Sequence, residues 1–289
     1  MKVIVIGGLT NGKIVLDYLM ANKYVYVPFV ITHPSTYRGP RCVDIHSSIS
    51  GTKVIQELDA NRYVNTVKRI EPDLIIVAGW SGMLSKELIN VPKLGTVGFH
   101  PSKLPKDRGR SVLAWQIEEG YTETALTMFY YNELPDCGDI IAQELIKIEV
   151  NDYVSDIMDK VDDATYNIMR AYFPLIRNGE APRKPQDLND GSFRRLRTDR
   201  DSVINWDSNA EVIYNKIRAI SRPYPGAHFF HKNKKIKVWK SAIINGIDEL
   251  PADKMMPGHI ARKLDEYSYV ISCRDKFLKI QTDIGLEDL

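Results

Sequence analysis

The stretch that decides the fold is residues 1–20, MKVIVIGGLTNGKIVLDYLM. Lys2–Ile6 is a short run rich in β-branched residues, and Gly7 and Gly8 follow it directly. Lys13–Met20 then carries apolar side chains at helical spacing, which predicts an amphipathic helix. A strand, a glycine turn and a helix in this order are typical of the start of a doubly wound α/β fold.

Strands and helices are expected to alternate over the following residues. The expected strands are Tyr24–Ile31, Leu74–Ala78, Thr96–Phe99, Ala125–Tyr131 and Ile140–Ile148. The expected helices are Val54–Ile70, a short one from Lys86, Ser111–Glu119 and Ser155–Ile176. This order predicts an α/β protein with a Rossmann-like, mostly parallel sheet and helices on both faces.

The composition changes after the last of these helices. Residues 181–203 are rich in proline and basic residues and are expected to form a linker, so residues 1–180 are predicted to form a catalytic domain. Residues 204–289 are predicted to form a small, β-rich C-terminal subdomain. Its expected elements are a helix, Asn209–Ala219, and the strands Ala227–Phe230, Lys235–Ile244, Tyr269–Ser272 and Phe277–Gln281.

The charge and cysteine content of the chain argue against several classes of function. The 289 residues carry 39 Lys+Arg and 37 Asp+Glu, a net charge of +2, and phosphate-binding proteins usually show a clear basic excess. Nucleic-acid binding is therefore not expected. Cys42, Cys137 and Cys273 lie far apart without metal-ligand spacing, which predicts no metal site and fits a reducing cytoplasm. We see neither a secretion signal nor a run of about 20 apolar residues, so no membrane span is expected.

Two segments carry candidate chemistry. The first, residues 98–110, GFHPSKLPKDRGR, places His100 at the carboxyl end of an expected strand. Ligands bind at that edge of α/β sheets, and histidine transfers protons near neutral pH. The second, residues 135–139, PDCGD, is a tight loop that carries Asp136. Taken alone, His100 also fits a loop-capping residue, and the second segment also fits an ordinary turn.

Together the two segments resemble the formyltransferase family, which includes methionyl-tRNA formyltransferase, glycinamide ribonucleotide transformylase and the sugar N-formyltransferases. The family pattern is roughly Asn-x-His-x-Ser-Leu-Leu-Pro-x-x-Arg-Gly, followed further along the chain by Asp-x-Gly. Residues that match it in order and spacing are His100, Ser102, Leu104, Pro105, Arg108, Gly109, Asp136 and Gly138. The resemblance covers about residues 1–245.

The chain departs from the family pattern at two positions. Gly98 stands where the family has an asparagine that is thought to donate a hydrogen bond to the oxyanion, and Lys103 replaces a leucine. The pattern His-Pro-Ser-x-Leu-Pro-x-x-Arg-Gly-Arg resembles sugar formyltransferases of the pseudaminic-acid type more than the tRNA enzyme. Protonated His100, a bound water and the Asn132 amide are candidate replacements for the lost donor.

The resemblance implies N10-formyltetrahydrofolate as the formyl donor and a primary amine as the acceptor. It implies that His100 transfers protons and that Asp136 orients it or relays a proton through water. The residues expected to bind the folate are Trp80, Met83, Leu84, Leu134, Pro135, Cys137, Gly138 and Ile140. The residues expected to bind the acceptor are Gly8, Leu9, Thr10, Ser102, Lys103 and Arg108.

Several functions stay open at this point. An amino sugar or sugar nucleotide used in surface glycan synthesis is the favoured acceptor, because the charge is nearly balanced. Initiator tRNA formylation and hydrolysis of the formyl donor are alternatives on the same site. A non-catalytic relative is a further alternative because of Gly98, whereas the broken glycine pattern of residues 7–12 disfavours an NAD enzyme. The β-rich tail offers a surface for a homodimer.

Overall fold

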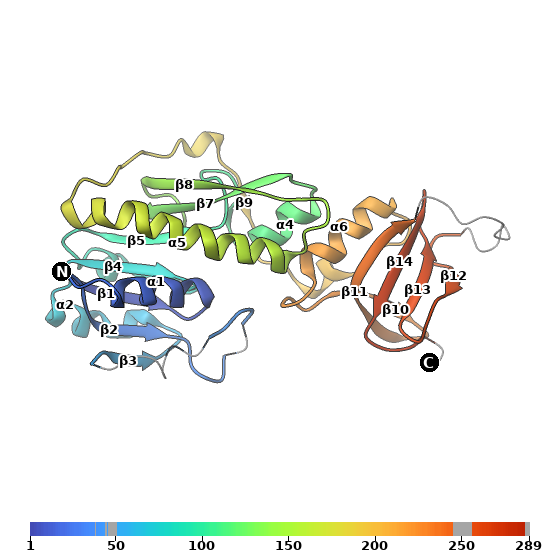
Figure 1. Cartoon of the computed structure of the whole chain (residues 1–289), viewed down its shortest axis with the longest axis horizontal. Coiled ribbons are helices and arrows are strands. Elements are labelled where there is room, and N and C mark those ends of the chain that lie inside the picture. The colour runs from blue at the N-terminus through green and yellow to red at the C-terminus, as the bar shows by residue number, and fades with distance from the viewer. Residues whose placement is uncertain (38, 44, 46–50, 245–255, 287–289) are drawn as a thin grey trace. The chain divides into compact units, whose positions relative to one another are not determined.

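The structure is a computed structural model that describes residues 1–37, 39–43, 45, 51–244 and 256–286 (Figure 1). It divides into two compact units. The first unit comprises Met1–Gly109, Thr124–Ile146 and Met158–Arg194. The second unit comprises Arg110–Glu123, Lys147–Ile157 and Arg195–Leu289.

A seven-stranded sheet forms the centre of the first unit, in the order β3-β2-β1-β4-β5-β7-β8. Strands β1 to β5 are parallel, and β7 runs antiparallel to β5. The order 3-2-1-4-5 is that of the Rossmann fold, in which ligands bind beyond the carboxyl ends of the strands. The strands are β1 (Lys2–Gly7), β2 (Tyr26–Thr32), β3 (Lys53–Gln56), β4 (Leu74–Ala78), β5 (Thr96–His100), β7 (Glu123–Tyr130) and β8 (Ile140–Lys147).

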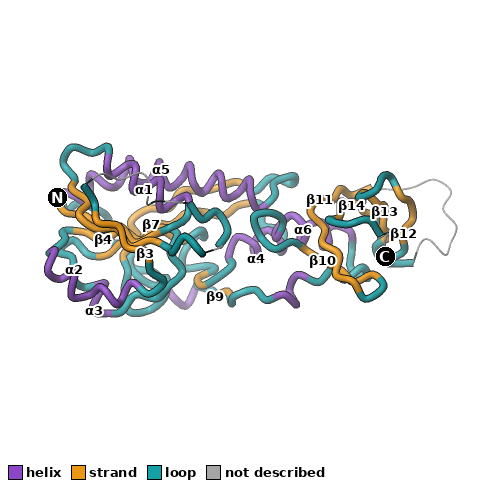
Figure 2. The backbone as a smooth tube through the Cα atoms, turned by 90° about the horizontal axis from the view of Figure 1, so that it is seen from below, coloured by secondary structure: helices purple, strands orange, loops and turns teal. Residues whose placement is uncertain are grey.

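Helices cover both faces of this sheet. Figure 2 shows α1 (Thr10–Met20) and α5 (Val154–Asn178) on one side of the strands, and α2 (Val64–Ile70) and α3 (Lys86–Ile89) on the other. Strand β4 is buried along its whole length, as expected for a parallel strand covered on both faces. The predicted fold class, a mostly parallel α/β sheet followed by a small β-rich region, is confirmed.

The expected helix Val54–Ile70 is wrong in its first half. Lys53–Gln56 forms the edge strand β3, which pairs in parallel with β2, because Val54 and Ile55 are β-branched residues that fit a sheet. A 3₁₀ turn, Ala60–Tyr63, follows, and the Asp59 side chain caps it by accepting a hydrogen bond from the Asn61 N–H. Only Val64–Ile70 is α-helical.

The predicted linker, residues 181–203, contains short elements of its own. Lys184 forms a bridge with Ile140, and β9 (Phe193–Arg194) pairs in parallel with β6 (Arg108–Gly109). Two 3₁₀ turns, Leu188–Asp190 and Asp199–Ser202, lie on either side of β9. The chain therefore returns to the His100 loop before it enters the C-terminal region.

Among its described residues, the second unit contains the helices α4 and α6, the first turn of α5 and a five-stranded antiparallel sheet in the order β10-β11-β14-β13-β12. Of these strands, β12 has no counterpart among the expected ones. Residues 245–255 and 287–289 of the predicted subdomain lie outside the described residues. The elements are α4 (Val112–Glu118), α6 (Ala210–Ile220), β10 (Ala227–His231), β11 (Lys234–Ile244), β12 (Ile260–Lys263), β13 (Ser268–Ser272) and β14 (Phe277–Thr282).

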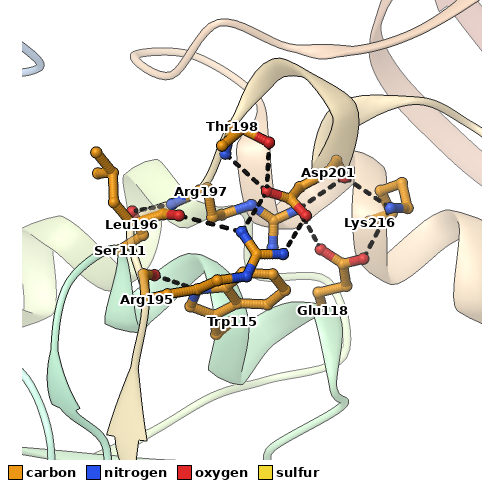
Figure 3. Close-up of polar contacts among 9 residues, drawn as sticks. All are labelled: Ser111, Trp115, Glu118, Arg195, Leu196, Arg197, Thr198, Asp201 and Lys216. Carbon is orange, nitrogen blue, oxygen red and sulfur yellow. Dashed lines mark hydrogen bonds and ion pairs between the residues drawn. The ribbon is translucent and has the colours of Figure 1, made fainter.

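A polar network joins three segments of the second unit (Figure 3). The Glu118 carboxylate at the end of α4 pairs with Arg197 at 2.5 Å and with Lys216 of α6 at 2.8 Å. The Arg197 guanidinium also lies 4.2 Å from the Trp115 ring centroid. All three ion-pair side chains are less than 20% exposed, so the network is a buried cross-link within this unit.

Nothing among the described helices combines the length and the apolar character that crossing a bilayer requires.

Candidate active site

His100 lies at the carboxyl end of β5, between β4 and β7, and its side chain is 8% exposed. Its Nε2 lies 2.8 Å from the backbone oxygen of Asp107. A carbonyl oxygen only accepts hydrogen bonds, so we assign the proton to Nε2 in this contact. The other ring nitrogen, Nδ1, is thereby left as the atom at which His100 can exchange a proton.

Asp136 faces that nitrogen. Its Oδ1 lies 3.7 Å from His100 Nδ1, beyond direct hydrogen-bond distance but within reach after a small shift. Its Oδ2 accepts a hydrogen bond of 2.9 Å from the Gly109 N–H. One oxygen is therefore fixed by the backbone of the His100 loop, and the other is directed at the imidazole. The two residues that the sequence motifs singled out are brought together.

Gln186 holds the loop that carries Asp136 through two hydrogen bonds to its backbone. The Gln186 amide donates hydrogen bonds to the backbone oxygens of Asp136, at 3.0 Å, and Gly138, at 2.6 Å. Asp136 itself has a positive φ of 55°, a conformation that aspartate tolerates better than most residues. Sequence analysis did not assign Gln186 to the site, although it lies in a segment that resembles the family.

The position of His100 depends on a buried ion pair. Asp107, whose backbone oxygen holds Nε2, is 2% exposed, and its carboxylate accepts hydrogen bonds from Arg194 Nε at 2.6 Å and Ser192 Oγ at 3.2 Å. Arg194 lies on β9, far along the chain, so no local motif points to it. We regard Asp107 and Arg194 as residues that position the imidazole.

Hydroxyl groups hold the first part of the His100 loop. Ser102 is fully buried, and its Oγ donates to the backbone oxygen of Lys106 at 2.7 Å. Thr127 of β7 donates to the backbone oxygen of Ser102 at 2.6 Å. The Ser102 hydroxyl is therefore used by the loop itself, whereas the adjacent Lys103 is exposed. Their contact with an acceptor stays a prediction.

Arg108 is directed at the second motif. Its Nη1 donates to Cys137 Sγ at 2.9 Å, and that thiol donates to the backbone oxygen of Pro135 at 3.0 Å. The side chain thus ties the two motif loops together. Arg108 keeps a buried Nε without a hydrogen-bond partner, and its contact with the acceptor stays a prediction.

Two loops carry the residues that were expected to bind the folate. Met83 and Leu134 are 63% and 57% exposed, whereas Leu84 and Ile140 are buried in the core. An ion pair of 2.5 Å between Lys86 and Glu133 links the two loops. Trp80 stacks on His33, Pro135 is exposed, and Gly138 is buried. Both loops therefore present exposed apolar side chains: Met83 on the first, and Leu134 and Pro135 on the second.

The glycine turn after β1 is partly occupied by the chain itself. The N–H and hydroxyl of Thr10 both point to the backbone oxygen of Arg41, at 3.1 and 3.4 Å. Gly8 packs against His33, and Leu9 forms a bridge with Cys42. The predicted role of Gly8, Leu9 and Thr10 in acceptor binding stays a prediction.

The sequence of the chain matches the models of a known family. A model described as "Formyl transferase" matches residues 1–172, and a model described as "Formyl transferase, C-terminal domain" matches residues 197–287. The chain belongs to the formyl transferase family. The family predicted from the sequence is thus confirmed.

Individual members of the family share modest identity with the chain. A methionyl-tRNA formyltransferase from Syntrophus aciditrophicus (strain SB) is 29% identical over 281 residues, which cover 94% of this chain and 87% of that protein. An N-formyltransferase from Helicobacter canadensis, solved with folinic acid and dTDP-3-aminofucose, superposes with a TM-score of 0.72 at 18% identity and covers 98% and 99% of the two chains.

Two further solved structures share this fold. WlaRD, a sugar 3N-formyl transferase solved with dTDP and 5-N-formyl-THF, superposes with a TM-score of 0.71 at 18% identity over 98% of each chain. HypX from Aquifex aeolicus, solved with tetrahydrofolic acid, gives a TM-score of 0.70 at 17% identity and covers 97% of this chain. This chain spans only 43% of the length of HypX.

Within the described ranges, no group of three or more His, Cys, Asp or Glu side chains is placed to hold a metal ion.

Proposed function

We propose that this formyl transferase moves the formyl group of N10-formyltetrahydrofolate to the primary amine of an amino sugar or sugar nucleotide. The observation that carries the proposal is the pair His100–Asp136 at the carboxyl end of β5. The imidazole is fixed through Nε2, and the carboxylate is fixed through Oδ2, so that Nδ1 and Oδ1 face each other at 3.7 Å.

The pair suits the proton transfers that the reaction needs. The amine nitrogen attacks the formyl carbon, the amine loses a proton, and the N10 atom gains one as its bond to the formyl carbon breaks. General acid–base groups typically accelerate such steps by about 10²–10⁴-fold. We infer that His100 exchanges protons at Nδ1 and that Asp136 accepts or relays the proton directly or through one water.

The two linked loops supply a surface for the donor. Met83 and Leu134 are exposed apolar side chains, one on each loop, and burying them against a flat aromatic ring would be favourable. An exposed ion pair between Lys86 and Glu133 spans the two loops. Members of the same fold were solved with folate compounds, which supports a folate as the donor.

The acceptor is proposed from two lines of support. Two members of the fold were solved with a dTDP or dTDP-sugar ligand, and this chain spans nearly their full length. The net charge of +2 gives little attraction for a long polyanion. We therefore place an amino sugar or sugar nucleotide ahead of a nucleic acid as partner.

Initiator tRNA formylation is the second candidate. It is favoured by the 29% identity with a methionyl-tRNA formyltransferase over 281 residues. Donor hydrolysis and a non-catalytic relative are the remaining alternatives.

The three cysteines form no disulfide, which supports a reducing compartment such as the cytoplasm. The edge strands β10 and β12 of the C-terminal sheet are the surfaces that we propose for a homodimer.

The test is tetrahydrofolate release from N10-formyltetrahydrofolate, followed by absorbance, with a panel of amino-sugar nucleotides, free amino sugars and charged initiator tRNA. Release driven by one amino sugar, with a formyl group added to its mass, is the expected result. Release driven by charged tRNA alone would favour the second candidate, and release without any acceptor would favour hydrolysis. Failure both to turn over and to bind the folate would overturn the proposal.

A further inference from the structure

Position 98, two residues before His100, is where the chain departs from the family pattern. Side chains at positions i and i+2 of a strand lie on the same face, so a side chain at position 98 would project beside His100. The family pattern has an asparagine amide there, but this chain has Gly98. A hydrogen-bond donor is therefore missing from the strand itself.

The space beside Gly98 is filled by Tyr131. A Cβ atom on Gly98 would lie 2.2 Å from Cε2 of the tyrosine ring, 3.1 Å from Cζ and 3.2 Å from Cδ2. No side chain other than hydrogen fits at such distances. The ring thus occupies the place of the family's asparagine, and Cζ, the atom that carries the hydroxyl, is among its nearest atoms.

The ring is held in this place on several sides. Tyr131 follows β7 directly, and its ring stacks on Phe129 at 5.3 Å between centroids with an angle of 13°. Phe129 is the partner of Gly98 across the β5–β7 pairing. The ring also packs against the cluster formed by Leu104, Phe129 and Ile140. A group fixed in this way is preorganised, which is what oxyanion stabilisation requires.

The hydroxyl keeps its proton. Burial raises the pKa of the Tyr131 phenol above its ordinary value, and the negative charge of Asp136 raises it further. The phenol is therefore a neutral hydrogen-bond donor throughout the neutral range, and it lies within electrostatic range of the Asp136 carboxylate. The phenol of the ring beside Gly98 thus feels the charge of Asp136, the residue that faces His100.

The Asn132 amide is a poorer substitute. Its Oδ1 accepts a hydrogen bond of 3.0 Å from the Leu134 N–H, and the residue is exposed. An exposed amide that is already part of a turn is not preorganised toward a buried imidazole. The Tyr131 ring, in contrast, is held beside Gly98 by its packing against Phe129 and the cluster around it.

We propose that Tyr131 is a catalytic residue whose hydroxyl replaces the family's asparagine and donates a hydrogen bond to the formyl oxygen as the tetrahedral intermediate forms. The inference rests on the proposed function. The C=O π pair moves onto oxygen as the amine nitrogen bonds to carbon, and the phenol stabilises the resulting negative charge without giving up its proton. Gly98 and Tyr131 are then a coupled pair, since the glycine makes room for the ring.

The first test is Tyr131→Phe in the full-length protein, because phenylalanine keeps the ring and removes only the hydroxyl. We expect kcat to fall by about 10²–10³-fold, the usual cost of one oxyanion donor, with little change in the KM for the folate. The matched control is Tyr130→Phe, one residue earlier, whose ring lies against Arg183 at 3.5 Å. The control should keep the wild-type kcat. A Tyr131→Phe enzyme with near wild-type kcat would overturn the inference.

The second test restores the family's donor. Gly98→Asn alone should lose activity and thermal stability, because its Cβ meets the tyrosine ring. The double variant Gly98→Asn/Tyr131→Ala makes room for the amide and should turn over at least about tenfold faster than Tyr131→Ala alone. Equal rates for those two variants would contradict the inference, provided that thermal melts show both are folded; if either is not, Tyr131→Phe alone decides.

The turnover rate of the wild type distinguishes a failure of the inference about Tyr131 from a failure of the proposed function. A wild type that turns over, together with an active Tyr131→Phe variant, overturns only the role of Tyr131. A wild type that neither releases tetrahydrofolate nor binds the folate overturns the proposed function, and the inference with it.

Discussion

His100 and Asp136 are the residues whose replacement should remove transfer without removing the fold. His100→Asn keeps a side chain that can hydrogen-bond to the Asp107 oxygen but cannot exchange a proton near neutral pH. We expect kcat to fall by about 10²–10⁴-fold, while the melting temperature changes little. Turnover close to that of the wild type, measured by tetrahydrofolate release, would contradict the assignment of His100 as the proton-transfer residue.

Gly138 allows the Asp136 loop to pass close to β7. A Cβ atom there would lie 1.7 Å from the backbone oxygen of Tyr130, so Gly138→Ala must displace the loop. We expect a loss of about 10²-fold in kcat, because a misplacement of about 1 Å at a reacting group costs that much. The measurement is kcat together with a thermal melt.

Gly179 is the matched control for that substitution. It has a positive φ of 75°, but nothing lies within 4 Å of an added Cβ atom. Gly179→Ala should therefore cost roughly 1–2 kcal/mol of folding free energy through backbone strain and leave kcat unchanged. Equal kcat values for the two alanine variants would contradict the claim that Gly138 matters through the Asp136 loop.

At the scale of elements, β9 should stabilise the site through Arg194. Arg194→Ala leaves the Asp107 carboxylate, which is 3% exposed, without its guanidinium partner. Breaking a buried pair on one side typically costs about 3–5 kcal/mol. We expect a lower melting temperature and, because Asp107 holds His100 Nε2, a lower kcat with little change in KM.

Arg195 offers a control beside it. Arg195 is 60% exposed and pairs with Asp201, so Arg195→Ala should cost only about 0–1 kcal/mol. If the two alanine variants melt at the same temperature, Arg194 does not have the structural role that we assign to it.

The network of Figure 3 gives a second prediction at this scale. Glu118→Ala leaves Arg197 and Lys216 without the carboxylate that lies between them, and both are mostly buried. We expect a loss of about 3 kcal/mol or more in folding free energy, read from chemical denaturation. Glu119→Gln, at the next and exposed position, should stay within about 0.5 kcal/mol of the wild type.

Local patterns predicted most elements but not how they meet. The apolar run Leu74–Ala78 and the motif around His100 were sufficient to place β4 and β5. Residues 54–56 were included in the expected helix Val54–Ile70 although Val54 and Ile55 are β-branched, because their pairing with β2 is not visible in the local sequence. Tyr131 was missed for a related reason: the sequence does not say that β7 pairs with β5, so nothing places the ring beside Gly98.

The whole chain has the fold class predicted from the sequence. Its division into two compact units, however, does not follow a single cut along the chain. Segments Arg110–Glu123 and Lys147–Ile157 belong to the second compact unit although they lie within the predicted domain 1–180. The boundary between residues 1–180, 181–203 and 204–289 stays a prediction. A contact between segments distant in sequence, such as Arg194 with Asp107, leaves no periodic signal that could reveal it.

Two carboxyl groups should contribute to the pH dependence of the chain's stability, and their contributions should have opposite signs. Burial raises the pKa of Asp162 to about 6, although the guanidinium of Arg41 acts to lower it. The folded state then holds this proton where the unfolded state has lost it, so stability falls as the pH rises from about 4 through 6. The pKa of Asp201 is instead lowered, mainly by its hydrogen bond to Arg195. Its contribution is present above the unfolded pKa and is lost in acid.

Two variants separate these contributions by denaturation at several pH values. Asp162→Asn removes the buried charge and should be more stable than the wild type at pH 8, with the difference shrinking as the pH falls from about 6 to about 4. Asp201→Asn should be less stable than the wild type at pH 8, and its deficit should shrink only in stronger acid. The two differences must therefore have opposite signs at pH 8, and a constant difference for Asp162→Asn across this range would show that burial does not govern that carboxyl group.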